Sequence, residues 1–383
     1  MAYIKRFHVE GLAGREPPYS VELNRDVNVF CGINGSGKTT LLKILHSALS
    51  TDTSILSGLP FKRAEVEVHL NRYNKSFARR FEQPKVLEAP DEAQDSGVHD
   101  IYRPMVFIPV KAPAWQSVPP EPEGGPLTVY ARGYLPITRL YRSVKRQGKR
   151  TGTMSEEELD ASFAAMLQRL WASYWSGVSA EVSRAQQRGL ANILHHVLSG
   201  EEPPSDDPKA PDFGEAYKRV VSFLSRQPGI VDALDSKEEF QRKYESKARV
   251  RSVVKQINAI ERVVEDVESP RRVLQAFLEA MYAGAKRIEF TDNEVKVTLP
   301  DKSEIGLPSL SSGEKQLFYL LLEALRSSSH SLIIDEPELS MHVDWQKRLI
   351  SVLRALNPDM QLIMATHSPE ITADLRDDKV FSL

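Results

Sequence analysis

The chain has 383 residues, of which 41% are hydrophobic and 27% are charged, a composition that excludes wholesale disorder. Its 50 basic and 52 acidic side chains nearly cancel, which excludes general polyanion binding, and its one cysteine, Cys31, excludes an internal disulfide framework. No apolar run approaches the ~20 residues that span a bilayer. The first residues also lack a secretory signal. We therefore expect a soluble cytoplasmic protein without a membrane partner.

The first forty residues predict short strands and then a sharp turn into a helix. Apolar and polar side chains alternate from 2 to 9, and residues 27–31 are a compact β-prone run. Glycines interrupt this run at 32–37, and leucines at helical spacing follow from 39 to 49. A strand, a glycine-rich loop and a helix follow one another in the order that a phosphate-binding loop requires.

The middle of the chain predicts antiparallel strands and then a helical insertion. Alternation returns from 62 to 81, and residues 105–110 have the pattern of a buried strand. The segment SEEE at 155–158 predicts a capping box, and helical patterning then continues to Pro270. Strand alternation returns at 281–307. We expect three regions: an N-terminal lobe at 1–150, a helical, partly coiled-coil insertion at 151–284 and a C-terminal lobe at 285–383.

Residues 32–39, GINGSGKT, match the pattern G-x-x-x-x-G-K-[ST]. Glycines let backbone N–H groups approach phosphates at the positive end of the following helix. The lysine can reach the β- and γ-phosphates, and the threonine hydroxyl can bind Mg²⁺. The residues expected to hold the nucleotide are Asn34, Gly35, Ser36, Gly37, Lys38, Thr39 and Thr40.

An apolar run that ends in two carboxylates, SLIIDE, occupies residues 331–336. A buried strand here places Asp335 beside the phosphate loop, where it can hold Mg²⁺ through water. Glu336 is then placed to polarise the attacking water. Taken alone, the segment is equally compatible with a strand that merely ends in charge.

The segment LSSGEKQ at 310–316 stands between the two previous segments in the chain. Serine and glycine at a helix start make an anion-binding N-terminus. A generic helix cap explains Ser311 or Ser312 equally well when the segment is taken alone.

Together these segments resemble the ABC-type ATPases. GINGSGKTT is similar to their Walker A motif, LSSGEKQ to their signature, LIIDEPE to their Walker B motif and ATHSPE to their switch-histidine segment. The resemblance covers both ends of the chain and not its middle. It implies an α/β P-loop NTPase fold of the ABC-ATPase type, with a mixed sheet flanked by helices.

The resemblance also implies an enzyme that hydrolyses ATP with Mg²⁺. Catalysis is expected from Lys38, Glu336 and His367, and metal binding from Thr39 and Asp335. In that family two ATPase domains pair head to tail, so one protomer closes over nucleotide held by the other. The residues expected to close over the partner's nucleotide are Ser311, Ser312, Gly313 and Glu314.

Within the family, DEPEL, Asp344-Trp345-Gln346 and ATHSPE resemble the branch near RecF, SMC and OLD (overcoming lysogenisation defect) proteins. Transporter subunits usually carry an aspartate where this chain has His342, and they lack so long an insertion. Too few residues follow His367 for the nuclease domain that OLD-type proteins append. We therefore expect any nuclease activity to come from another chain.

Two biological roles remain open at this stage. One is an ATP-dependent switch, a homodimer or higher homo-oligomer, that controls a separate nuclease or toxin in defence against phage or foreign DNA. The other is a RecF/SMC-like clamp in DNA repair or chromosome maintenance. A transporter energy subunit is disfavoured by His342, and a non-hydrolysing scaffold by the Asp335-Glu336 pair.

A basic stretch from Arg132 to Arg150 contains seven Lys or Arg residues and no acidic residue. With Tyr134 and Tyr141 interleaved, it can track a nucleic-acid backbone, dock an acidic partner protein or form a solvated face. Gln116 is the nearest candidate for the family's Q-loop glutamine.

Overall fold

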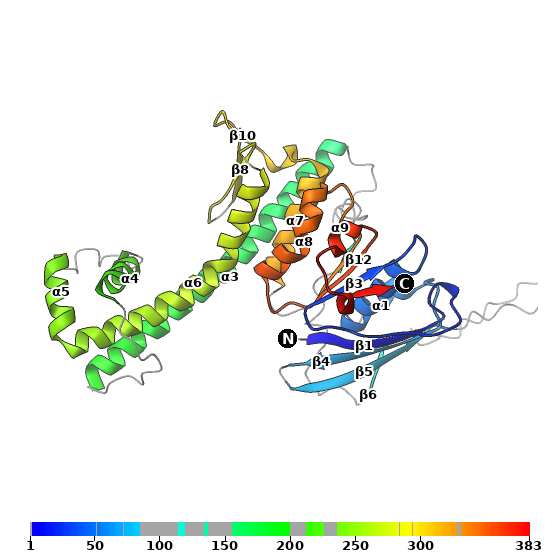
Figure 1. Cartoon of the computed structure of the whole chain (residues 1–383), viewed down its shortest axis with the longest axis horizontal. Coiled ribbons are helices and arrows are strands. Elements are labelled where there is room, and N and C mark those ends of the chain that lie inside the picture. Colours follow the sequence, from blue (N-terminus) through cyan, green and yellow to red (C-terminus); the bar gives the residue numbers. More distant parts are fainter. Residues whose placement is uncertain are drawn as a thin grey trace, which may run out of the picture. The chain divides into compact units, whose positions relative to one another are not determined.

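The computed structural model describes residues 2–50, 52–71, 73–84, 114–118, 134–136, 155–199, 212–225, 236–282, 284–292, 294–327 and 331–383. They form two compact units, one of Met1–Leu159 with Leu310–Leu383 and one of Asp160–Ser309. The second unit extends past the expected boundary at 284, because the strands that follow its helices pack on them. Figure 1 shows the elements coloured along the chain.

A parallel five-stranded sheet organises the first unit, in the order β13-β3-β12-β11-β7. Its central strands are apolar and buried along almost their whole length, as is typical of a parallel sheet covered on both faces. The strands are β3 (Val27–Cys31), β7 (Tyr134–Pro136), β11 (Leu332–Asp335), β12 (Leu362–Thr366) and β13 (Val380–Ser382).

An antiparallel sheet in the order β2-β1-β4-β5-β6 completes the strands of this unit. Buried and partly exposed side chains alternate strictly along β4, so one face packs on the core. The strands are β1 (Ala2–Glu10), β2 (Tyr19–Glu22), β4 (Arg63–Leu70), β5 (Lys75–Glu82) and β6 (Gln116–Val118). The strands expected at 2–9 and 62–81 are confirmed, whereas 105–110 lies outside the described residues.

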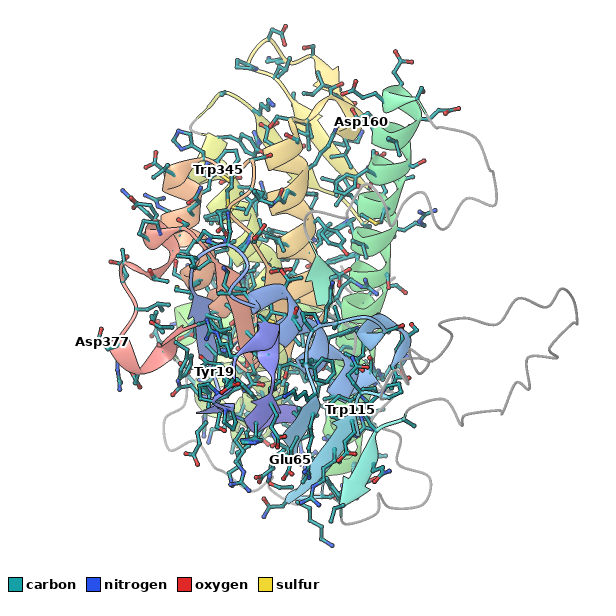
Figure 2. The ribbon with its side chains drawn as sticks, turned by 90° about the vertical axis from the view of Figure 1, so that its right-hand side faces the viewer. Tyr19, Glu65, Trp115, Asp160, Trp345 and Asp377 are labelled. Atoms are coloured by element: carbon teal, nitrogen blue, oxygen red, sulfur yellow. The ribbon has the colours of Figure 1, made fainter. Side chains whose placement is uncertain are left out.

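Helix α1 (Lys38–Ser50) packs against both sheets. One apolar core joins its leucines to side chains of β1, β4 and β5 and to Phe30, Ile333 and Ile363 of the parallel sheet. Trp115, labelled in Figure 2, extends this packing. Its indole donates to Ser47 Oγ at 2.9 Å, and its ring lies 5.4 Å from the Phe81 ring. This core fixes α1 against the parallel strands.

The remaining helices of this unit are short or medium in length. They are η1 (Leu12–Gly14), η2 (Ser54–Leu56), α7 (Ser312–Arg326), α8 (Val343–Leu356), α9 (Pro369–Thr372) and η7 (Asp377–Lys379). The fold class predicted from the sequence, a P-loop NTPase with a helical insertion, is confirmed by the strand–loop–helix order at β3 and α1 and by the helical second unit.

The second unit contains the long helices and a small antiparallel sheet. Its elements are α3 (Glu156–Ser199), α4 (Phe213–Ser225), α5 (Lys237–Ser246), α6 (Ala248–Tyr282), β8 (Arg287–Phe290), β9 (Val295–Thr298), β10 (Glu304–Ile305) and η6 (Leu307–Ser309). The predicted capping box at the start of α3 is confirmed by reciprocal hydrogen bonds between Ser155 and Glu158. None of the described helices is long and apolar enough to cross a membrane.

The expectation that helical structure stops at Pro270 is wrong, since α6 continues through it to Tyr282. A proline inside a helix removes one backbone hydrogen bond and displaces the preceding turn. The Arg272 guanidinium donates to the Glu265 carbonyl at 2.8 Å, one turn before the proline. Leu274 and Leu278 are buried beyond the proline, and this packing stabilises the continued helix.

Candidate functional site

The carboxyl ends of three parallel strands bring the predicted site residues together. In the register of the sheet, Asp335 lies opposite Ala365, and Thr366 lies opposite Cys31. The next residues along the chain, Gly32, Glu336 and His367, therefore leave the sheet at the same edge. Ligands of open α/β sheets bind at this edge.

The loop at 32–37 has the backbone of a phosphate cradle. Gly35 and Gly37 have φ values of 82° and 100°, which a residue with a Cβ adopts only with strain. The Ser36 side chain is buried, and its hydroxyl has no hydrogen-bond partner within the described ranges. Asn34 is exposed, while Thr39 and Thr40 are half-buried at the start of α1.

Position 32 needs glycine because other atoms approach it closely, and not because of its φ angle. A Cβ at this position would lie 2.3 Å from the Leu383 carbonyl oxygen and 2.9 Å from Ser36 Oγ. Leu383 is fixed there, because its amide donates to the Cys31 carbonyl at 2.8 Å. The end of β13 thus supports the first residue of the loop.

Lys38 lies beneath the loop with 4% of its surface exposed. Its Nζ donates to the carbonyls of Gly32 and Ile33, at 2.9 and 3.1 Å. Burial lowers the pKa of Lys38, and the carboxylates of Glu336 and Asp335 oppose that shift. Its ammonium is therefore held in the loop, close to both carboxylates.

Asp335 and Thr39 form the oxygen-rich corner expected for a divalent cation. The two side chains are hydrogen-bonded, and Asp335 Oδ1 is buried with no partner in the described part of the chain. Burial raises the pKa of Asp335; Thr39 opposes the rise, and the charge of Glu336 adds to it. A carboxylate and a hydroxyl fit Mg²⁺, which takes few protein ligands and completes its shell with water and phosphate. Among the described residues, no cluster of three His, Cys, Asp or Glu occurs.

Glu336 and His367 form a close pair at this edge. His367 Nε2 lies 3.4 Å from Glu336 Oε1, and about a third of each side chain is exposed. Glu336 has a φ of 53°, unusual for a residue with a side chain, while its amide donates to the Ala365 carbonyl at 2.8 Å. Strain of this kind is found at functional sites when the surrounding structure enforces it.

The start of α7 presents two exposed serines. Ser311 caps the helix and forms the capping box with Glu314, whose carboxylate accepts the Ser311 amide at 2.7 Å. Ser311 and Ser312 are exposed, whereas Glu314 and Gly313 are buried. A Cβ at Gly313 would lie 2.0 Å from the Ser340 carbonyl oxygen. The two serines are therefore open to an incoming anion, while Gly313 permits contact with the loop after β11 and Glu314 maintains the cap.

Other residues of the site escaped the sequence analysis. Glu338 accepts the His367 amide through Oε1. Gln316 donates to the Pro337 carbonyl at 2.9 Å, and Gln346 donates to Met341 and accepts from Ser368. The motif letters contained all of these residues, but only the tertiary structure shows which loops they join.

Two expected features lie elsewhere. Gln116 is exposed on β6, in the antiparallel sheet. The basic stretch Arg132–Arg150 lies outside the described residues except for 134–136, which form β7.

The arrangement suits phosphoryl transfer in its chemistry. It combines a backbone loop with a buried ammonium, an oxygen corner for a cation and a carboxylate paired with an imidazole. These are the parts that position phosphates and stabilise charge at a transferring phosphoryl group.

Known proteins resemble this chain along most of its length. Residues 172–374 match the family model described as "AAA domain, putative AbiEii toxin, Type IV TA system", and residues 16–269 match a model described as "AAA domain". The "Retron Ec83 probable ATPase" of Escherichia coli is 22% identical over 422 aligned positions, covering 98% of this chain and 70% of that protein.

A second curated relative and a solved structure are also similar. The "Retron Vc95 probable ATPase" of Vibrio cholerae is 23% identical over 195 residues, which cover 44% of this chain but only 37% of the relative. The Smc head domain of Pyrococcus furiosus, solved with the C-terminal domain of ScpA, is 15% identical, with a TM-score of 0.45. The alignment covers 97% of this chain and 92% of that structure.

Proposed function

The chain belongs to the AAA-domain family of ATPases, and from this premise we propose that it is a switch that dimerises around ATP and controls a separate effector protein. The observation that carries the proposal is the convergence of the phosphate loop, the Thr39–Asp335 corner and the Glu336–His367 pair at one sheet edge. The exposed serines of α7 support the dimer, because they offer a helix N-terminus to phosphate from a second protomer.

In the proposed reaction, Lys38 and the amides of the loop bind the β- and γ-phosphates. Thr39 and Asp335 would hold Mg²⁺, which supplies charge neutralisation when bound. A water oxygen attacks the γ-phosphorus, the bond to the bridging oxygen breaks and ADP leaves. Glu336 accepts the proton of the attacking water, and His367 orients the Glu336 carboxylate.

The role in defence is supported by the relatives. Two of them carry the name "Retron … probable ATPase", and one matching family has the description "AAA domain, putative AbiEii toxin, Type IV TA system". We propose that the effector is a nuclease or a toxin encoded as another chain. An affinity pull-down of tagged Glu336→Gln from the native host, with ATP present, should recover this effector in stoichiometric amount. Recovery of DNA and repair proteins alone would contradict the effector role.

The dimer can be tested at the start of α7. Ser312→Arg adds bulk and charge at an exposed position outside the capping box, so it should block ATP-dependent dimerisation while ATP binding remains. Ser351→Arg is the matched control, because it adds the same bulk and charge at an exposed position of α8 outside the site and should leave the ATP-dependent dimer unchanged. Light scattering with and without ATP measures the dimer. A Ser312→Arg protein that still dimerises with ATP would overturn the trans contact.

A clamp in DNA repair is the second candidate, and the long helices α3 and α6 favour it. This candidate predicts ATP hydrolysis that DNA stimulates and that falls steeply as salt is added. ATPase activity that is indifferent to DNA would leave the effector switch as the better account.

A further inference from the structure

Glu338 links the two loops that carry the Glu336–His367 pair. It follows β11 by three residues, and its Oε1 accepts the backbone N–H of His367, the first residue after β12. Its Oε2 is buried and has no hydrogen-bond partner in the parts of the chain that the structure describes. The two carboxylate oxygens therefore differ: one holds the neighbouring loop, and the other has no bond.

The position of this link in the sheet explains its importance. Strands β11 and β12 are paired up to Asp335 and Ala365, and the last ladder bond runs from the Glu336 amide to the Ala365 carbonyl. Beyond that bond the backbones separate. The Glu338–His367 hydrogen bond is the next connection between the two loops, and it acts on the residue that bears the imidazole.

The carboxylate also lies within electrostatic reach of the phosphate loop. Burial raises the pKa of the Cys31 thiol, and the charge of Glu338 adds to that rise. The same charge contributes to holding up the pKa of Lys38 against the larger effect of burial. Glu338 is therefore part of the charge cluster at this edge and not a remote loop contact.

We propose that Glu338 is a positioning residue for ATP hydrolysis, which holds the backbone of His367 so that the imidazole stays on the Glu336 carboxylate. This inference rests on the proposed roles of Glu336 and His367. It predicts that Glu338 acts through His367 and not on the nucleotide itself. Its loss should lower kcat far more than it changes the KM for ATP, because it removes no hydrogen bond of the phosphate loop or of the Thr39–Asp335 corner.

The fold should tolerate substitution of this residue. A buried carboxylate oxygen without a partner is destabilising, so its removal is not expected to unfold the protein. The same two loops are also joined through Gln346, which contacts both Met341 and Ser368. Loss of the Glu338 contact therefore frees the His367 backbone, while the Gln346 contacts still hold the two loops together.

A double-mutant cycle on the full chain tests the proposal. Glu338→Ala should lower kcat by about 10- to 100-fold, and Glu338→Gln, whose amide oxygen can still accept the His367 N–H, should recover most of that loss. His367→Ala should lower kcat by about 10²-fold or more. The double variant Glu338→Ala/His367→Ala should be no slower than His367→Ala alone, because residues that act as a unit are not additive.

Glu370→Ala is the matched control, since Glu370 is a partly exposed carboxylate near His367 that pairs with Lys347 at 3.5 Å. It should keep kcat within about twofold of wild type, with thermal unfolding measured on every variant.

Three outcomes would overturn the inference. Additive losses in the double variant would mean that Glu338 acts independently of His367. A Glu338→Gln protein as slow as Glu338→Ala would mean that the charge and not the acceptor matters. Wild-type kcat in Glu338→Ala, together with a slow His367→Ala, would remove the positioning role while the proposed function stands. If His367→Ala itself were as fast as wild type, the proposed role of His367 would fail first.

Discussion

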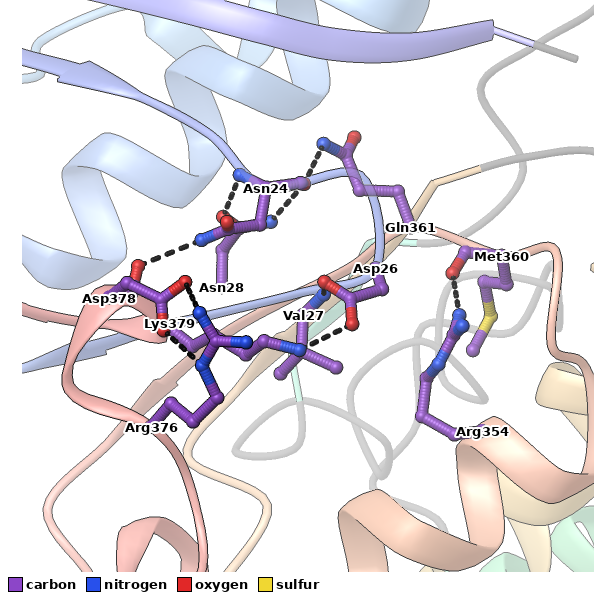
Figure 3. A network of polar contacts seen from close by, with 10 residues as sticks. All are labelled: Asn24, Asp26, Val27, Asn28, Arg354, Met360, Gln361, Arg376, Asp378 and Lys379. Atoms are coloured by element: carbon purple, nitrogen blue, oxygen red, sulfur yellow. Dashed lines mark hydrogen bonds and ion pairs between the residues drawn. The ribbon is translucent and has the colours of Figure 1, made fainter.

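The parallel sheet has an amino edge, where its strands begin, and a carboxyl edge, where they end. Polar side chains are used in opposite ways at these two edges. At the amino edge, Asn24 and Asn28 bond each other twice, at 2.6 and 2.8 Å, and Gln361 donates to the Asn24 carbonyl (Figure 3). Gln361 also bonds the amide and the carbonyl of Ile4. At the carboxyl edge, buried oxygens of Ser36, Asp335 and Glu338 have no partner in the described structure. Strained backbone is also found there, at Glu336 and Ser340.

The molecule gains stability at the amino edge and gives stability up at the carboxyl edge. Buried polar groups are nearly always hydrogen-bonded in folded proteins, so the few exceptions are informative. At the amino edge, side chains that are fully hydrogen-bonded fix the starts of the strands. At the carboxyl edge, polar groups without partners are left to bind a ligand. Substitutions at the carboxyl edge should therefore impair activity more than folding, and substitutions at the amino edge should impair folding more than activity.

The largest expected effect tests the carboxyl edge. Glu336→Gln removes the base and should lower kcat about 10³-fold, because general base catalysis contributes 10²–10⁴-fold. ATP binding should persist, so the closed dimer should accumulate, and the free energy of unfolding should stay within about 1 kcal/mol of wild type. Steady-state hydrolysis and chemical denaturation measure the two effects. Near-normal turnover would remove Glu336 from the role of base.

A substitution at the amino edge should lower stability and leave the activity of the folded protein nearly unchanged. Gln361→Leu removes bonds to the Ile4 amide and carbonyl, the Asn24 carbonyl and Ser331 Oγ. We expect a loss of about 3 kcal/mol in the free energy of unfolding, because buried groups are left without partners. The kcat per folded molecule should remain within about twofold. Gln83→Leu is the control, since its side-chain amide donates to two carbonyls among the described residues and is partly exposed. Equal losses in the two variants would argue against a special amino-edge network.

The pH dependence of stability offers a finer test on α1, the helix that leaves the phosphate loop. Burial lowers the pKa of His46 to about 4, from 6.5, and the charge of Asp52 opposes the shift. The unfolded chain therefore takes up this proton first, and stability falls as the pH drops from about 6.5 towards 4. Between pH 7.5 and 5 the loss should be about 2 kcal/mol more in wild type than in His46→Gln.

Denaturant unfolding at the two pH values measures this difference, with His8→Gln on β1 as a control for loss of a histidine. The same pH dependence in His46→Gln as in wild type would assign the acid sensitivity to other groups.

The smallest expected loss of stability comes from ion pairs on the exposed side of the amino edge. Arg376 makes two hydrogen bonds to Asp378, but 79% of its side chain is exposed. Arg376→Ala should therefore cost less than about 0.5 kcal/mol. Lys379→Met should cost more, about 1 kcal/mol, because Lys379 binds the less exposed Asp26. Burial alone would raise the pKa of Asp26, yet the hydrogen bond and charge of Lys379 lower it. A larger loss from Arg376→Ala than from Lys379→Met would reverse this order.

Local patterns predicted the elements that carry the site. Strand β3, the glycine loop and α1 follow from composition and spacing alone, and so does the apolar strand before Asp335. The capping box at Ser155 was likewise readable, because its two partners are three residues apart. Features of this kind depend on neighbours in the sequence.

Features that depend on tertiary contacts could not be predicted. In α3, for example, Leu167 and Trp171 are fully buried, and the Trp171 indole donates to the Thr291 carbonyl, which is remote in sequence. The need for glycine at 313 comes from Ser340, which is remote in sequence. Glu338 became visible as a site residue only once two strand ends were placed side by side.

The approach of Leu383 to Gly32 has a practical consequence for protein engineering. Any polypeptide that follows Leu383, whether a natural continuation or an added purification tag, begins in van der Waals range of the phosphate loop. A fusion at that end would therefore crowd the nucleotide site from its first residue. A tag placed before β1, or a long flexible spacer after Leu383, is the safer design for activity assays and for crystallisation with nucleotide.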